Sequence, residues 1–200
     1  MGQTRPRRDT SGTPVQGKYT FENADLSVFK GISGKLSSKG DYAGMLGRIE
    51  ASGSSDTPDF MVKLSGNPVH LMTEFHAIID GTNGKTLLQP VNAHFGRSYV
   101  VANGGMAGTP GVKGKTVSLD VTAKDVRLED MLLLGVHAKE PPMTGTVSFH
   151  AQLVIPPGDI DVAKKLHLQG AFALDSAEFT ELNIQREGRH SQPSGTGKDR

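Results

Sequence analysis

Phosphate binding is the first chemistry that the residue types and spacings of this chain could provide. A glycine-rich stretch begins at Gly108 and ends in Gly114-Lys115-Thr116, which comes close to a phosphate-binding loop. That loop needs four residues between its first glycine and Gly-Lys-Thr, and a helix after it. Five residues intervene here, and Thr116 begins an alternating stretch typical of a strand. We therefore interpret 108–114 as a connecting loop.

Oxygen ligands for calcium are the second possibility. Asp80, Thr82 and Gly84 fit the start of a calcium loop, but Gln89 and Pro90 stand where further carboxylates are needed. The run from Asp80 to Gly84 contains Asn-Gly, which accepts positive φ at low cost and is a strong hairpin signal. The sequence therefore predicts a turn here, with positive φ at Asn83.

Histidines are the third group. His76, His94 and His150 fall on polar positions of expected strands, and the first two could approach each other across the predicted hairpin. Two histidines without a carboxylate or a third ligand make a poor metal site. We expect solvated neighbours and no metal.

Catalysis finds little support in the sequence. There is no G-x-S-x-G elbow and no cysteine, which excludes thiolate nucleophiles and thiolate metal sites. We propose no catalytic residue and no cofactor, and we expect that the chain is not an enzyme. A hydrolase would need a compact polar pocket that brings distant residues together.

The elements that would position any site are strands with one apolar face. Apolar side chains alternate with polar ones from Val117 to Ala123, from Val147 to Leu153 and from Phe75 to Ile79. Because side chains of a strand point to opposite faces with period two, each segment has one apolar and one wet face. The sequence therefore predicts an all-β, mainly antiparallel fold: a curled, one-sided sheet or groove with one or two short helices.

Two segments break the alternation and predict the helices. Val126 to Leu134 has helical spacing, with Asp125 placed to cap it, and 159–165 follows a Pro-Pro-Gly turn with Ile160 facing inward. The further expected strands are Lys18–Glu22, Gly34–Ser38, Gly47–Ala51, Asp59–Leu64, Thr86–Phe95, Ser98–Asn103 and His167–Asp175.

Length and composition set the domain organisation. The chain has 200 residues, 25 glycines and a formal net charge of +1, so nucleic acid is not an expected partner. Polar, charged ends predict tails at 1–15 and 185–200 around one domain at 16–184. No apolar run of membrane-helix length and no signal-peptide pattern occurs, which leaves two alternatives: a cytosolic protein, or a fragment whose targeting segment lies upstream.

The order of several motifs is similar to the C-terminal region of AsmA-like proteins. The resemblance covers about Tyr19 to Ile184. The segments that carry it are Thr57–Phe60, His76–Gly84, Leu88–Phe95, Gly114–Val121, Val126–Leu134, Pro141–Val147 and Leu168–Phe172.

What this resemblance implies is an envelope protein of a double-membrane bacterium, similar to bridge-type lipid carriers. Such proteins have a long curled sheet with an apolar interior, and they take part in phospholipid transfer and outer-membrane assembly. The implied partners are phospholipid acyl chains and, through an anchor upstream of this sequence, the inner membrane. The implied location is the periplasm. The polar run after Ile184 departs from the family pattern.

The apolar face holds the expected binding residues. One reading is a groove that acyl chains cover in part; the other is a sandwich or closed core that serves as a structural or protein-interaction module. Burial of apolar area is favourable by about 25 cal/mol per Å² in either case, so composition does not choose between them. The groove candidates are Phe75, Ile79, Val91, Phe95, Val117, Leu119, Val121, Phe149, Leu153, Leu168 and Phe172, and Leu174 shares their face.

Overall fold

Strands dominate the computed structural model, which describes residues 10–180. The strands are β1 (Pro14–Asp25), β2 (Ile32–Ser33), β3 (Lys35–Met45), β4 (Arg48–Val62), β5 (Pro68–Ile79), β6 (Thr86–Phe95), β7 (Ser98–Gly108), β8 (Lys115–Arg127), β9 (Met143–Ile155) and β10 (His167–Phe179). The helices are α1 (Leu128–Gly135), the single turn α2 (Val162–Lys165) and the 3-10 turn η1 (Leu26–Val28). The predicted all-β class is confirmed.

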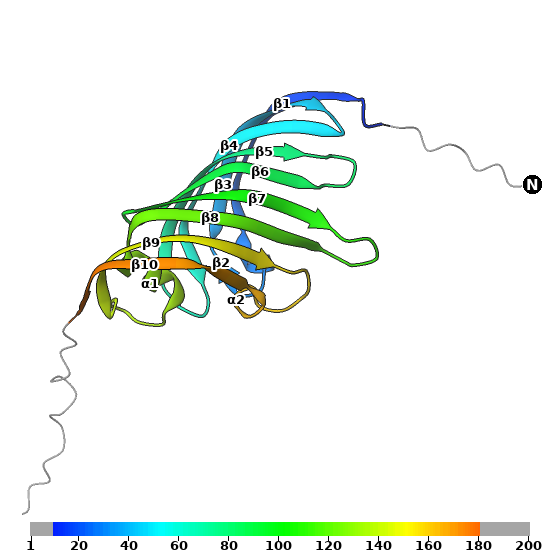
Figure 1. Cartoon of the computed structure of the whole chain (residues 1–200). Coiled ribbons are helices and arrows are strands. Elements are labelled where there is room, and N and C mark those ends of the chain that lie inside the picture. Colours follow the sequence, from blue (N-terminus) through cyan, green and yellow to red (C-terminus); the bar gives the residue numbers. More distant parts are fainter. Residues whose placement is uncertain (1–9, 181–200) are drawn as a thin grey trace, which may run out of the picture.

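All ten strands belong to one antiparallel sheet with nearly sequential order. The order is β1-β3-β4-β5-β6-β7-β8-β9-β10, and the short β2 pairs with β4. The sheet curls without closing, so β1 and β10 are its two margins (Figure 1). Each strand after β3 is a hairpin partner of the one before it. The fold is therefore built almost wholly from chain-adjacent pairings.

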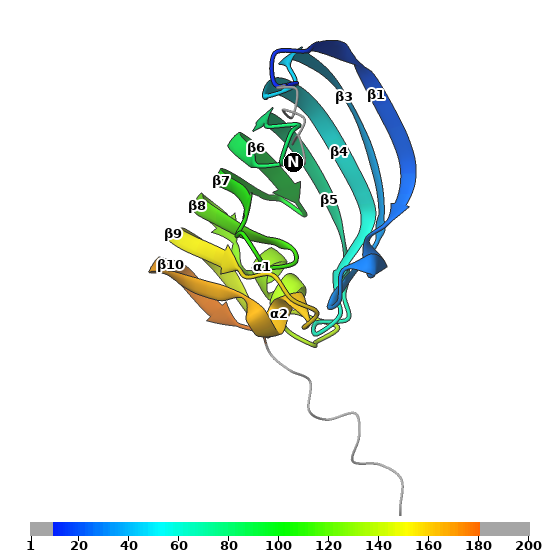
Figure 2. The ribbon, with the colours of Figure 1, turned by 90° about the vertical axis from the view of Figure 1, so that its right-hand side faces the viewer.

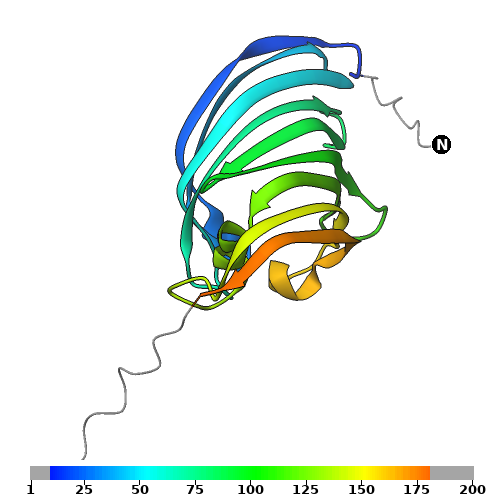
Figure 3. The same cartoon turned by 60° about the vertical axis from the view of Figure 1, so that its left-hand side comes forward.

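The apolar face is the inner face of the curl. Val126 and Val147 are directly paired on β8 and β9, and both belong to the buried cluster against which residues of α1 pack. In two views that differ in direction, α1 lies inside the curl (Figures 2 and 3). The side of the sheet that carries these valines therefore faces inward.

The predicted hairpin is confirmed, but the residue with positive φ is Gly84, one position later than expected. Ile79 pairs with Thr86, and the turn is held by Gly84 N–H donating to the Asp80 carbonyl at 2.6 Å. Gly84 has φ +71°, whereas Asn83 is not among the residues with positive φ. Asn83 instead uses its side chain, which donates to Asp80 and accepts from the Lys85 N–H. The expectation of positive φ at Asn83 was wrong.

Two predicted strands are one in the structure. Gly47–Ala51 and Asp59–Leu64 are both largely contained in β4, which runs through the serine-rich stretch between them. That stretch lacks apolar alternation because its inward positions are small. At Gly53 a Cβ would lie 2.6 Å from the Tyr19 hydroxyl and 3.1 Å from the Phe75 ring, so the two aromatic side chains already cover this position.

Both helices differ from their predicted bounds. α1 begins at Leu128 with Arg127 at its N-cap, and Asp125 does not cap it. Asp125 lies in an irregularity of the β8–β9 pairing with φ +51°, where its N–H donates to the Ser148 hydroxyl. The second helix is only the turn α2, and Ile160 is 59% exposed rather than inward.

The sheet begins before the predicted domain boundary at residue 16. Pro14 and Val15 already pair with β3, and the Thr13 carbonyl accepts from the Leu46 N–H at 2.8 Å. Residues 10–13 of the predicted tail are also tied to the sheet, since the Ser11 carbonyl accepts from the Gly47 N–H at 2.8 Å. Residues 1–9 and 181–200, and with them the predicted domain end at 184, lie outside the described residues. Within 10–180 no helix combines the length and apolar character needed to cross a membrane.

Candidate functional site

The strand register places all eleven groove candidates on the inner face. Phe75 pairs with Val91, and Phe149 pairs with Phe172, so each pair shares one side of the sheet. Leu153 is the link between strands, since it opposes Leu119 on β8 and Leu168 on β10. The remaining candidates follow by the same alternation: Ile79, Phe95, Val117 and Val121.

This face continues across the sheet from margin to margin. On β7 it holds Ala102 and Met106, which pair with Val121 and Val117. Toward β1 the inner face becomes less aliphatic and more aromatic, because Tyr19 lies over Gly53. The inner face therefore presents an apolar surface that spans β5 to β10 and an aromatic one near β1.

Helix α1 covers one end of the inner face and makes the only buried apolar cluster of several large residues among those described. The cluster consists of Val69, Phe95, Val100, Ala123, Val126 and Val147, and Leu128, Met131, Leu133 and Leu134 of the α1 segment pack against it. Val126 is 2% exposed and Phe95 is 6% exposed. Phe95, which the sequence placed in the groove, is therefore a core residue, and Val121 and Phe149 also pack against this core.

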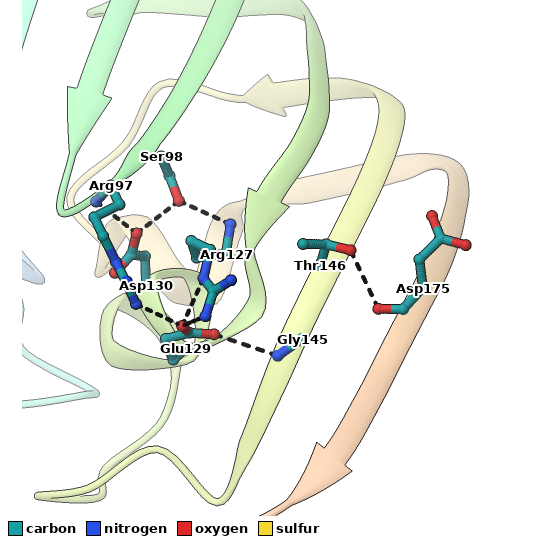
Figure 4. A network of polar contacts seen from close by, with 8 residues as sticks. All are labelled: Arg97, Ser98, Arg127, Glu129, Asp130, Gly145, Thr146 and Asp175. Carbon is teal, nitrogen blue, oxygen red and sulfur yellow. Dashed lines mark hydrogen bonds and ion pairs between the residues drawn. The ribbon is translucent and has the colours of Figure 1, made fainter.

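A polar network fixes α1 on the sheet (Figure 4). Asp130 accepts from the Arg97 N–H at 2.8 Å and from the Ser98 hydroxyl at 2.7 Å, both in the β6–β7 hairpin. The Ser98 hydroxyl in turn accepts from the Arg127 N–H at 3.0 Å. One carboxylate thus joins the first turn of α1 to a hairpin more than thirty residues earlier.

Glu129 makes the second half of this network. Its Oε1 lies 2.6 Å from Arg127 Nη2 and 3.0 Å from Arg97 Nη2, and its Oε2 accepts from the Gly145 N–H of β9. Burial raises the pKa of this carboxyl, but hydrogen bonds and the Arg127 charge outweigh burial, so the pKa lies below its ordinary value. The folded protein therefore favours the ionised form of Glu129.

Two contacts join the halves of the sheet across its inner side. The Asn67 amide after β4 donates to the carbonyls of Leu133 and Val136 at 3.1 and 3.0 Å, which ties the β4–β5 turn to the end of α1. The Val162 N–H of α2 donates to the Lys30 carbonyl at 2.8 Å. The second contact brings the β9–β10 connection to the turn between η1 and β2.

Away from α1 the inner face has no second layer among residues 10–180. Only nine apolar residues are buried, and four of them are alanines: Ala51, Ala77, Ala123 and Ala151. Large side chains such as Leu119, Leu153 and Met106 stay half-buried, and Leu168 and Phe172 at the β10 margin are 53% and 54% exposed. An apolar face of this extent, left open, is characteristic of a binding surface.

The opposite face carries the shallow hollows that would suit polar ligands. One of them crosses β1, β3, β4 and β5 and is lined by Lys18, Lys39, Glu74 and His76. Lys18 forms an exposed ion pair with Asp41 at 3.3 Å. These side chains are solvated surface groups, whereas a second hollow on this face includes Leu87 and Val154 in its lining.

The residues first considered for metal or phosphate chemistry do not converge. His94 contacts Tyr99, with ring centroids 4.7 Å apart, and His150 contacts the Thr122 hydroxyl, so the histidines lie apart on the outer face. No group of three potential metal-ligating side chains occurs within 10–180. The loop 109–114 joins β7 to β8 as a hairpin, without the helix that a phosphate loop needs.

The sequence did not single out Arg97, Ser98 and Asn67 as structural residues. The partners of these side chains described above lie 29 or more residues away, and no local pattern indicates such contacts. Comparison with known proteins found no matching family model, no similar curated protein and no similar solved structure.

Proposed function

We propose that this chain is a non-enzymatic lipid-binding protein whose inner sheet face receives phospholipid acyl chains. The observation that carries the proposal is the open inner face: large apolar side chains on β6 to β10 lie half-exposed because α1 covers only one end. Water contact with such side chains is unfavourable by about 25 cal/mol per Å², and acyl chains would relieve it. The strands within residues 10–180 form one sheet, which makes this face unlike a sandwich core.

The proposal extends to the cellular role through the AsmA-like order of motifs. We infer that the chain is the C-terminal part of such a protein and acts in phospholipid transfer or outer-membrane assembly. Its place would be the periplasm, held to the inner membrane by an anchor in a longer protein. The curled sheet is compatible with this role.

Lipid binding is tested by mass spectrometry of lipid that co-purifies with the full chain and by loading with phospholipid vesicles. The probe variant is Leu119→Asp, on the open part of the inner face opposite Leu153. The matched control is Ser118→Asp, next to it on the outer face of the same strand. A carboxylate in the path of an acyl chain must lose its water, which is costly.

We expect phospholipid on the unchanged chain and on Ser118→Asp, and several-fold less on a folded Leu119→Asp variant. Unchanged chain that carries no lipid and takes none from vesicles would overturn the proposal. Equal lipid on both variants would place the ligand elsewhere on the molecule.

A protein-interaction module is the second candidate, and the margins of the sheet favour it. Every residue of β10 is exposed, including large apolar ones. Edge strands of this kind bind partners through backbone pairing. The experiment above separates the two candidates, because a pure interaction module would purify without lipid.

A further inference from the structure

The two margins of the sheet differ in how they are protected against pairing. β1 carries Pro14 and the charged side chains of Lys18 and Glu22, which are features that block edge-to-edge association. β10 contains no proline, and from Leu168 to Leu174 it carries no charged side chain, while all thirteen of its residues are exposed. In Figure 3 β10 forms the free lower margin of the sheet. An edge without such protection is a template for another strand.

The regular part of β10 limits how a partner strand can pair. Pairing with β9 is continuous from His167 to Asp175 and becomes irregular between Asp175 and Glu178. Ser176 has φ +54°, which ends the extended geometry. Nine residues, 167–175, are therefore available for an uninterrupted ladder, and their centre is Ala171.

We propose that β10 pairs antiparallel with β10 of a second copy of this chain, with Ala171 opposite Ala171. Two-fold pairing over the full nine residues allows this register alone. It keeps the inner faces of both copies on the same side, because residues of equal parity oppose each other. The interface is isologous and closes as a dimer.

The side chains agree with this register independently. His167 of one copy opposes Asp175 of the other at both ends of the ladder, where the imidazole can donate to the carboxylate. On the inner face Leu168 opposes Leu174, and the ring of Phe172 lies over Gly170 of the partner, the same arrangement as Tyr19 over the directly paired Gly40 within the chain. The pairing would cover Leu168, Phe172 and Leu174 at the exposed margin of each copy and join the two inner faces into one.

Cysteine cross-linking of the full chain tests both the interface and its register. The chain has no cysteine, so an introduced thiol reports only on itself. In an antiparallel pair the opposed Cα atoms lie about 4.5–5.5 Å apart, within disulfide range. Ala171→Cys should therefore form a covalent dimer under mild oxidation.

Ala173→Cys is the matched control, on the same strand and the same face. In the proposed register its two copies are offset by four residues, about 13 Å along the strand, which is beyond disulfide reach. We expect slow or no cross-linking of this variant. Equal rates for the two variants would overturn the register.

Light scattering after size-exclusion chromatography measures the association itself. The unchanged chain should show a concentration-dependent dimer, and Ala171→Lys should raise the dissociation constant about fivefold or more through like charges at the two-fold axis. Gln16→Lys, on the outer face of the opposite margin, should leave it unchanged. A chain that stays monomeric at several hundred micromolar and does not cross-link at Ala171→Cys would assign this edge to a different partner and overturn the proposal.

Discussion

The two ends of the inner face carry similar apolar residues but use them differently. At the α1 end, valines and Phe95 are buried beneath a helix that Asp130 and Glu129 hold in place. Toward the start of β8, leucines on the same strands stay half-exposed with nothing of the described chain above them. The difference comes from what covers the face rather than from the residues that form it.

This contrast assigns separate roles to one continuous surface. Burial at α1 supplies the packing that fixes the curl, whereas the uncovered part contributes less to stability and remains available to a ligand. A single-layer sheet without any covered part would lack a core. The covered end is therefore what allows the rest of the face to stay open.

The largest expected effect is an aspartate in the covered end. Val126→Asp would bury an unpaired carboxylate at a 2% exposed position, and we expect a loss of at least about 3 kcal/mol and unfolding near room temperature. Leu119→Asp, on the same strand in the open part, should stay folded because water reaches the carboxylate. Chemical denaturation followed by circular dichroism compares the two. Equal destabilisation would mean that the face is covered throughout.

Phe149→Asp refines the boundary between the two parts. Phe149 packs against the buried cluster and also lies 5.5 Å from the Phe172 ring at the open margin, between centroids. We expect a destabilisation between those of the other two aspartate variants, because one side of the ring is covered and the other is not. The same denaturation series measures it.

The polar network that fixes α1 on the sheet gives the next effect, which depends on pH. Glu129→Gln replaces a carboxylate that meets two arginines, at a cost of about 1–2 kcal/mol at neutral pH. Hydrogen bonds and the Arg127 charge outweigh burial and hold the folded-state pKa of Glu129 below its ordinary value. The stabilisation is therefore present above about pH 4.5 and is lost as the pH falls through the folded-state pKa.

The measurement is the free energy of unfolding of both proteins between pH 3 and 7. The difference in the free energy of unfolding between the unchanged chain and Glu129→Gln should become smaller as the pH falls. Glu74→Gln, an exposed carboxylate of β5 on the outer face, is the control and should stay within about 0.5 kcal/mol throughout. A gap that is constant with pH would show that the carboxylate charge does not hold α1.

The sequence predicts the open part of the face better than the covered part. Alternation along β8 and β9 is a local pattern, and it placed Leu119 and Leu153 on one side of the sheet, where the register confirms them. That Phe95 is buried depends on α1 folding back over β6, which no local pattern encodes. The same holds for the polar network around α1, since the sequence shows Glu129 only as an acidic residue within the predicted helix Val126–Leu134.

The missed part of β4 has a physical cause of the same kind. Gly53 and Ser55 carry no apolar signal, yet they occupy inward positions because aromatic rings from β1 and β5 fill the space above the glycine. A strand is recognised from its own side chains, and here the apolar side chains come from its neighbours. Bounds of this type follow from packing rather than from periodicity.

The turn at the open end gives an effect of similar size to that of Glu129→Gln. Gly84→Ala forces a Cβ into a position with φ +71° and should cost about 1–2 kcal/mol. Gly135→Ala is the control, because an added Cβ there meets no atom within 4 Å and φ is not positive. Thermal melting compares them. A Gly84→Ala protein as stable as the control would contradict the left-handed geometry of this turn.

The smallest effect is expected where the two halves of the sheet meet at Lys30. Its ion pair with Asp159 spans 2.9 Å, but the two side chains are 55% and 87% exposed, so water screens the attraction. The backbone bond from Val162 to the Lys30 carbonyl remains when the side chain is changed. Lys30→Met should therefore alter the free energy of unfolding by less than about 0.5 kcal/mol. Gly31→Ala is the contrasting variant, because Gly31 is buried with φ +92° and a Cβ would lie 3.0 Å from the Val162 nitrogen. A larger loss for Lys30→Met than for Gly31→Ala would mean that charge, rather than close backbone approach, holds the halves together.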